Sequence, residues 1–158
     1  MRDEQELEQA LQEGLLEETH FLDVKREVAP GRAANHETAR DLASFSIDGG
    51  EYIIGVDEDA QQLYAVPLSG LAERVEQVCL SVVDPPLILR SQAIPAADRP
   101  GMGYLVVSVP PSPAAPHMVD HTYWARGDKT KFRLSDAEVI RLHERRRTWE
   151  LRAKQSVR

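Results

Sequence analysis

A pair of glycines directly ahead of a short apolar run narrows the choice of folds for this chain more than any other part of its sequence. Ile47-Asp48-Gly49-Gly50 predicts a tight turn, because glycine adopts positive φ at no steric cost. The run that follows, Tyr52 to Val56, is apolar on both alternations, which is typical of a strand buried in the middle of a sheet. Asp57 comes directly after it, so a carboxylate is expected at the end of a buried strand.

The remaining periodicities predict a mixture of helices and strands in irregular order. Leucines at 7, 11 and 15 recur every fourth residue and predict an amphipathic helix that begins near Asp3. Ser135 and Glu138 form a capping box that opens a last helix. Further helices are expected at 35–45 and 71–82, and strands at 19–27, 62–66, 87–94, 104–109 and 122–126. This order predicts a mixed α/β (α+β) fold with one sheet packed against helices.

Length and composition limit the possible classes of protein. The 158 residues correspond to about one folding unit, which we place at 1–147, followed by a basic tail at 148–158. No apolar run approaches the roughly 18 residues of a membrane helix, and the acidic N-terminus is unlike a signal peptide, so we expect a cytoplasmic protein with no membrane contact. Cys79 is the single cysteine, which excludes an intrachain disulfide and a site built from several thiolates.

The charge is distributed unevenly along the chain. The net charge is −7, yet residues 121–158 carry 11 Lys and Arg against 5 Asp and Glu, and residues 1–120 carry 8 against 21. A basic segment on an acidic body favours a nucleic-acid or other acidic partner at that end. The alternative is a solvated basic helix face without a partner.

Three carboxylates predict a metal site. Asp23 and Lys25 are two residues apart on the first expected strand, so their side chains point to one face. Metal-dependent nucleases use such a pair, with the carboxylate on Mg²⁺ or Mn²⁺ and the lysine on developing charge. Glu18 is five residues before Asp23 and reaches the same face only if it precedes the strand. With Asp57, these residues form a predicted ligand set for a hard cation. The alternative for Asp23 and Lys25 is an ordinary exposed pair on an edge strand.

Several ordered segments resemble the Schlafen-type Alba-like domain family. The segment at 18–25, Glu-Thr-His-Phe-Leu-Asp-Val-Lys, is similar to the opening acidic "EFK" segment of that family. Residues 43–57 resemble its "AFANTDGG…IGVDD" signature, and residues 109–117 its "VPxS…PH" loop. Residues 123–127, Tyr-Trp-Ala-Arg-Gly, resemble its "YxRxG" strand end. The resemblance covers about Leu7 to Arg147, nearly the whole chain.

This resemblance implies a lobe like one half of a Schlafen core, which binds nucleic acid. Vertebrate Schlafen proteins include endoribonucleases that cleave transfer and ribosomal RNA at a three-carboxylate metal site. By resemblance that site comprises Glu18, Asp23 and Asp57, with Glu58 as a rival for the third position. The chain departs from the family by having aspartate in place of the usual glutamate at 23, and Ser46-Ile47 in place of Asn-Thr.

A basic segment near the C-terminal end could contact phosphates. Four cationic residues accompany two aromatic ones there, a combination typical of backbone contacts with base stacking. The predicted nucleic-acid-binding residues are Tyr123, Arg126, Lys129, Lys131 and Arg133.

Other chemistries find less support in the sequence. Gly127-Asp128-Lys129-Thr130 lacks the glycine spacing of a phosphate-binding loop, so no ATP site is expected. His117 and His121 lie in a proline-rich stretch where metal-ligand spacing loses its meaning, and Ser112 has no evident base in the sequence.

Three functions therefore remain open. The first is a metal-dependent endoribonuclease acting on structured RNA such as tRNA. In it Glu18, Asp23 and Asp57 hold Mg²⁺ or Mn²⁺ and Lys25 stabilises charge. The second is a DNA- or RNA-binding or regulatory module without catalysis, and the third a protein-interaction subunit. Because Schlafen cores pair two lobes, we expect a homodimer whose basic segments line a shared cleft.

Overall fold

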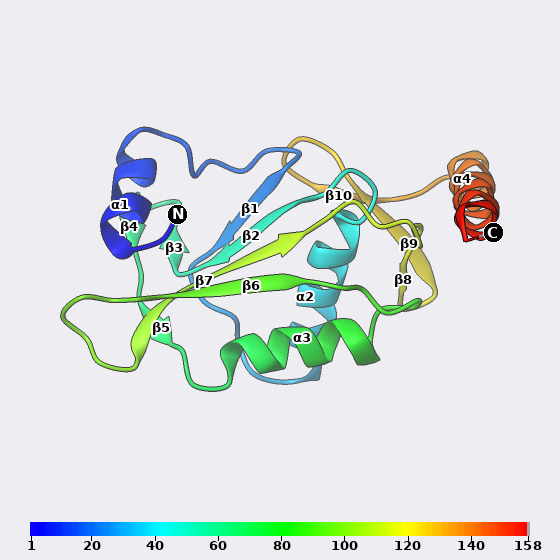
Figure 1. Ribbon diagram of the computed structural model, residues 1–158. Coiled ribbons are helices and arrows are strands. Elements are labelled where there is room, and N and C mark those ends of the chain that lie inside the picture. The colour runs from blue at the N-terminus through cyan, green and yellow to red at the C-terminus, as the bar shows by residue number, and fades with distance from the viewer. Residues whose placement is uncertain (158) are drawn as a thin grey trace.

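The computed structural model describes residues 1–157 and contains one central mixed sheet. Strand β1 (Leu22–Lys25) runs parallel to β2 (Gly50–Ile54), and β2 runs antiparallel to β7 (Met102–Val109). Two further strands pair with β7 in antiparallel fashion, namely β5 (Val66–Pro67) and β6 (Arg90–Pro95). Figure 1 shows β6 and β1 along opposite edges of this sheet. The α+β fold predicted from the sequence is thereby confirmed.

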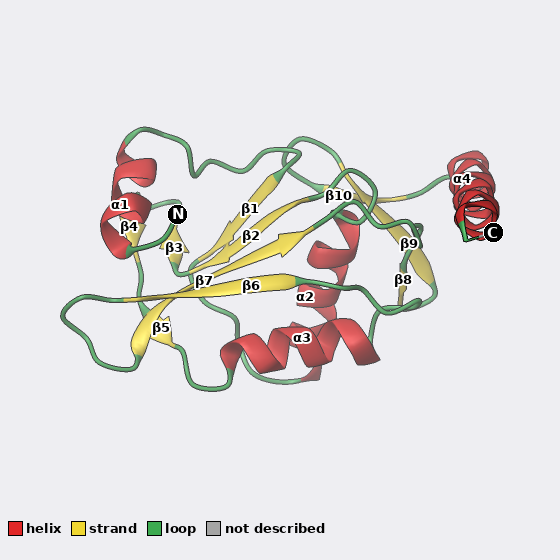
Figure 2. Ribbon diagram, viewed as in Figure 1, coloured by secondary structure: helices red, strands yellow, loops and turns green. Residues whose placement is uncertain are grey.

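Helices cover the two faces of the sheet unequally. Helices α2 (Arg32–Ser44) and α3 (Leu71–Ser81) lie on one face, where a large apolar cluster includes Tyr52, Ile54 and Leu105. Helix α1 (Glu4–Gln12) covers only part of the other face, over a smaller cluster that includes Ile53 and Tyr104. Figure 2 shows α1 at one end of the sheet and α2 and α3 below it. Both alternations of β2 are therefore buried, as predicted.

The two glycines are required for different reasons. Gly49 has φ of +83°, which favours glycine, and Gly50 lies so close to the ring of Phe45 that a Cβ atom there would collide with it. Phe45 follows α2 directly. The glycines thus bring the end of α2 into contact with the start of β2, and this fixes the helix on the sheet.

Short strands build a second layer of structure beside α2. Strands β8 (Met118–Val119), β9 (Thr122–Arg126) and β10 (Lys131–Arg133) form a small antiparallel sheet. Strands β3 (Val56–Asp57) and β4 (Gln62–Leu63) form a hairpin directly after β2. The sequence predicted one strand over 62–66, whereas the structure divides that stretch between β4 and β5, and it predicted neither β8 nor β10.

Helix α4 (Asp136–Ser156) extends away from the rest of the chain, at the right of Figure 1. The predicted Ser135–Glu138 capping box is present. Leu142 is its one buried residue, because the later turns lie beyond the sheet. The predicted boundary at residue 147 falls inside this helix, so residues 148–156 continue it. Two other differences are local: Leu16 and not Leu15 completes the buried stripe near α1, and α2 begins before Asn35. Within residues 1–157 no helix is long and apolar enough to cross a membrane.

Candidate nucleic-acid interface

A polar cavity of about 380 Å³ lies where the edge strand β1 meets α2 and the small sheet. Strand β1 contributes two side chains and the segment before it one, α2 contributes one, and the β9–β10 hairpin contributes five. The lining residues are Glu18, Asp23, Lys25, Asp41, Trp124, Arg126, Lys129, Thr130 and Lys131. The cavity therefore brings together most of the residues that the sequence placed in two separate predicted sites.

Asp23 is buried at the centre of a charge cluster. Its two carboxylate oxygens face different cations: Oδ1 lies 3.3 Å from the Lys25 ammonium, and Oδ2 lies 3.5 Å from Nη1 of Arg126. The side chains of Asp23 and Arg126 are each only 3% exposed. Since a buried carboxylate without a partner is costly, these two cations offset part of the free-energy cost of burying Asp23.

Asp41 is a second buried carboxylate of the cavity, and the sequence did not single it out. It lies on the inward side of α2, where its Oδ1 accepts a hydrogen bond of 2.8 Å from the Lys131 ammonium. Its Oδ2 lies 3.9 Å from the ammonium of Lys25. Burial raises the pKa of Asp41, and the two lysines oppose this shift. Lys25 thus stands between the carboxylates of Asp23 and Asp41.

Arg126 has a structural role that differs from the predicted phosphate contact. Its Nε donates to the carbonyl of Thr19 at 2.8 Å, and Nη2 donates to the carbonyl of Leu22 at 3.0 Å. The guanidinium also lies over the ring of Phe45, 4.8 Å from its centroid. All of its groups therefore contact the protein, and Arg126 joins β9 to the entry of β1.

Glu18 lies before β1, as required for it to reach Asp23. Burial raises the pKa of Glu18 to about 7, and a hydrogen bond with Asp23 and the charges of Asp23 and Glu58 add to this effect, while Lys25 opposes it. Glu58 approaches Glu18 from the β3–β4 hairpin, where its Oε1 accepts a long hydrogen bond of 3.5 Å from the Glu18 amide. The raised pKa favours the protonated form of the Glu18 carboxyl more than in an exposed glutamate.

Asp57 does not join these carboxylates around the cavity. Its Oδ1 accepts a hydrogen bond from the Ala60 amide at 3.0 Å, and its Oδ2 lies 4.0 Å from a nitrogen of Arg26. Glu58, the rival candidate, is the residue that contacts Glu18. Of the predicted ligand set, the structure brings Glu18 and Asp23 together but leaves Asp57 at the end of β3, outside the cavity.

The donor set does not fit a divalent cation in this arrangement. No group of three or more His, Cys, Asp or Glu side chains suited to hold a metal ion occurs between residues 1 and 157. The acids of the cavity face ammonium and guanidinium groups instead, with Lys25 occupying the space between Asp23 and Asp41. Mg²⁺ needs several oxygen ligands at close to 2 Å, so a lysine would have to leave before an ion could enter.

The predicted phosphate-contacting residues differ in how much they are already engaged. Lys131 contacts Glu37 and Asp41, and Tyr123 packs edge-on against His143 at 5.6 Å. Lys129 is exposed and forms no salt bridge within the described part of the chain. Arg133 is also exposed, with its guanidinium 6.0 Å from the Trp124 ring centroid. Lys129 and Arg133 are therefore the cations most available to a ligand.

Ser112 forms a hydrogen bond with the buried His117, a contact that the sequence did not reveal. His117 Nδ1 donates to the carbonyl of Pro85 at 2.6 Å, so its Nε2 accepts from the Ser112 hydroxyl at 2.7 Å. The Ser112 amide, however, donates to the carbonyl of Ser46, and the Ala114 amide donates to the Ser112 hydroxyl. Because these amide donors are already used, the Ser112–His117 pair holds loops together and offers no oxyanion hole for acyl transfer.

Comparisons with known proteins bear on the fold alone. No protein-family model matches this chain, and no curated protein matches it in sequence. Among solved structures, the DIP2311 protein from Corynebacterium diphtheriae is similar, with a TM-score of 0.57 and 16% sequence identity. The similarity covers 87% of this chain and 28% of that protein. The chain thus spans little more than a quarter of its structural neighbour and has the same fold as that part of it.

Proposed function

We propose that this chain is a nucleic-acid-binding domain that contacts the sugar-phosphate backbone at the cavity between β1 and the β9–β10 hairpin. The observation that carries the proposal is the convergence of four cationic side chains beside Trp124, of which Lys129 is free for a ligand and the other three are held by carboxylates of the protein. They come from β1, β9, β10 and the turn between the last two: Lys25, Arg126, Lys129 and Lys131.

Charge balance within the cavity supports a phosphate as ligand. Four cations face three acids, and burial raises the pKa of one of these acids, Glu18, which disfavours its negative charge. The two buried aspartates hold Lys25 and Lys131 in place, so these ammonium groups are oriented before a ligand arrives. A cation oriented in advance loses less side-chain entropy on binding.

The mouth of the cavity provides the direct contacts. Lys129 would bind a phosphate oxygen as a mobile point charge, and the neighbouring Thr130 hydroxyl could donate to the same group. Trp124 and Arg133 present an aromatic and a planar cationic surface on which a base can stack. Helix α4, which follows the hairpin, carries further arginines, Arg145 and Arg147 among them. These groups recognise a backbone and bases without selecting a sequence.

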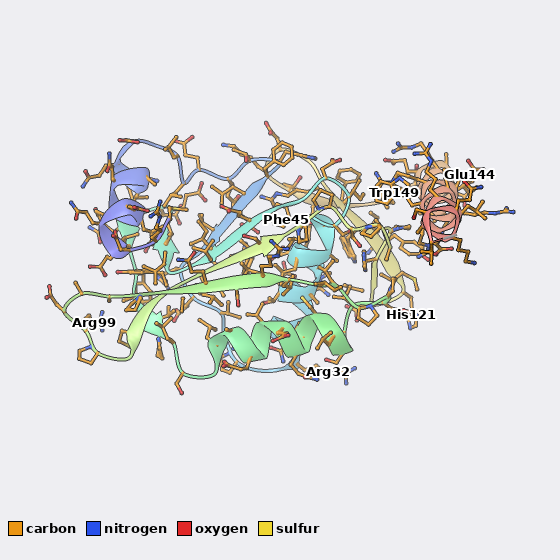
Figure 3. The ribbon with its side chains drawn as sticks, viewed as in Figure 1. Arg32, Phe45, Arg99, His121, Glu144 and Trp149 are labelled. Carbon is orange, nitrogen blue, oxygen red and sulfur yellow. The ribbon has the colours of Figure 1, made fainter. Side chains whose placement is uncertain are left out.

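Binding should be tested with fluorescent single-stranded RNA, a structured RNA and duplex DNA between about 50 and 200 mM salt. We expect affinity to fall steeply with salt, and Lys129→Ala to lower the slope of log affinity against log salt by about one. Arg99→Ala is the matched control, because Figure 3 places Arg99 at the end of the molecule opposite α4. Affinities unchanged by Lys129→Ala would contradict the proposal and leave the protein-interaction alternative.

The same samples test the predicted endoribonuclease. RNA should be incubated with Mg²⁺, with Mn²⁺ and with a chelator, using the wild type and Asp57→Ala. Retained binding without cleavage under all three conditions would support the non-catalytic module. Cleavage that requires a metal ion and is lost in Asp57→Ala would instead favour the nuclease and would mean that the carboxylates rearrange on substrate binding.

A further inference from the structure

The outer edge of β6 is open, although this strand is paired with β7 along its whole length. The register between them runs from Arg90 opposite Ser108 to Pro95 opposite Gly103. No other strand within residues 1–157 pairs with β6. Figure 1 shows it as the front edge of the sheet, with α3 below it. An edge of six residues is long for an exposed strand.

The hydrogen-bonding direction of each β6 residue follows from the ladder. The Ala96 amide donates to the carbonyl of Met102 at 2.9 Å, so the pairs that exchange hydrogen bonds with β7 include Ile94 with Tyr104 and Gln92 with Val106. The residues between them direct their amide and carbonyl groups away from β7. Ser91 and Ala93 therefore each present an outward N–H and C=O, and Pro95 presents only a carbonyl.

The centre of this edge lacks the usual features that prevent strand pairing, which are confined to its two ends, Arg90 and Pro95. Its centre, Ser91-Gln92-Ala93, is uncharged and exposed, with no bulge in the register and no proline before position 95. Ile88, two residues before the strand, is an apolar side chain that is 78% exposed. The opposite edge is different, because Arg126 occupies the carbonyls of Thr19 and Leu22 at the entry of β1.

We infer that β6 is an interface, and that its occupant is the β6 strand of a second copy of this chain. The strand is complementary to itself about a two-fold axis through Gln92. Antiparallel pairing in that register sets Ser91 opposite Ala93 of the other copy, and both residues are of the outward-facing kind. Their four N–H and four C=O groups then form four hydrogen bonds, which leaves none of these groups without a partner.

The side chains are compatible with this register. Gln92 meets its own symmetry mate on the axis, where two amides can hydrogen-bond to each other. Arg90 lies opposite Ile94 of the second copy, so no like charges face one another. Continuing the register by two residues places the exposed Ile88 opposite Ala96. The result is a continuous sheet across both copies, an example of strand addition at an edge.

The arrangement differs from the shared basic cleft expected from the sequence. The cavity proposed to bind nucleic acid lies at the β1 edge, and the dimer axis lies at the β6 edge. Two copies joined through β6 would carry their cavities at opposite ends of the continuous sheet. Each cavity would then contact a separate segment of a long ligand, and the gain in affinity would come from linked binding at two sites.

Substitutions that place opposite charges at position 92, alone and mixed, test the inference. Sedimentation or light scattering across a range of concentrations should show a dimer for the wild type. Gln92→Lys should dissociate at least about fivefold more readily, because like charges would meet on the axis with Arg90 of both copies beside them. In Gln92→Glu the same arginines offset part of the repulsion between the two carboxylates, so its loss should be smaller. An equimolar mixture of the two variants should recover the association, since opposite charges then face each other.

The controls separate loss of pairing from loss of folding. Both substitutions lie on an exposed position, so circular dichroism and the free energy of unfolding of the monomer should stay close to the wild-type values. Hydrogen exchange adds a local measurement: the amides of Ser91 and Ala93 should become more protected as protein concentration rises. A strict monomer at every concentration, or a dimer indifferent to both charges at 92, would overturn the inference.

Discussion

The two edges of the central sheet differ in what their outward-facing backbone groups contact. Both edge strands have backbone groups directed away from the sheet. At the β1 edge, Arg126 takes up the carbonyls of Thr19 and Leu22 and also neutralises Asp23. At the β6 edge, Ser91 and Ala93 keep their outward groups exposed. At the β1 edge, Arg126 satisfies the outward carbonyls at the start of the strand within the chain, whereas the outward groups at the centre of β6 stay exposed.

The contrast extends to charge. The β1 edge concentrates buried ions, with Asp23 and Asp41 each facing two cations. Removing one member of such a network leaves a buried charge without a partner. The centre of β6 has no ions, so changes there should act on association more than on folding. This difference predicts which substitutions unfold the protein and which only separate two copies.

Arg126→Ala should have the largest effect on stability. It removes the partner of Asp23 Oδ2 and the donors to two backbone carbonyls, and we expect the free energy of unfolding to fall by about 3–5 kcal/mol. Urea denaturation measures the loss. Arg133→Ala, an exposed arginine on the next strand, should stay within about 0.5 kcal/mol of the wild type. Equal losses of unfolding free energy in Arg126→Ala and Arg133→Ala would mean that the contacts of Arg126 at the β1 edge stabilise the fold no more than an exposed side chain does.

Proline substitutions in β6 should have intermediate effects that alternate along the strand. Gln92→Pro removes an amide that donates to β7 and should cost about 2 kcal/mol, because the carbonyl of Val106 is left without its partner. Ala93→Pro removes only an outward amide and should cost clearly less in dilute protein. Thermal unfolding compares the two variants. If Ala93→Pro proved the more damaging, the outward assignment of Ser91 and Ala93 would be wrong.

The apolar pattern of the sequence was sufficient to predict most of the central sheet. Tyr52 to Val56 predicted a strand buried on both faces. The structure confirms burial of both faces in β2, because α2 and α1 pack on its opposite sides, but β2 ends at Ile54, and Gly55, with φ of +113°, separates it from β3. Short strands were missed, since β8 and β10 comprise two and three residues and are too brief to show alternation. Their formation depends on packing against α2, which no local pattern records.

The cavity was predictable only in part. Glu18, Asp23 and Lys25 are near one another in sequence, so strand geometry alone brought them together. Asp41 belongs to a helix, and its approach to Lys25 depends on how the Gly50–Phe45 contact fixes α2. Asp57 was placed by its position at a strand end, but the chain turns into the β3–β4 hairpin there. Arg126 was predicted to contact nucleic acid, because the sequence shows that a side chain is charged but not whether it already binds groups of the protein.

The smallest predicted effect is the pH dependence contributed by Glu18. Its pKa in the folded protein is about 7, against a usual value of 4.5, so between these values the folded state binds the extra proton. Stability therefore falls as pH rises from about 4.5 to 7 and changes little from this group above that range. Because Glu18 is partly exposed, solvent screening reduces the effect to about 1 kcal/mol. Glu18→Gln should remove this part of the pH dependence.

Denaturation curves of the wild type and Glu18→Gln at pH 5 and pH 8 measure the difference. The variant should gain stability relative to the wild type at the higher pH, because it replaces a carboxylate that must ionise beside Asp23 with a neutral amide. Gln92→Glu provides the comparison at the open edge: an exposed carboxylate in the monomer titrates as it does in the unfolded chain and should leave the pH profile unchanged. If both variants followed the wild-type profile, Glu18 would be ordinary solvated surface, and the charge network of the β1 edge would end at Asp23.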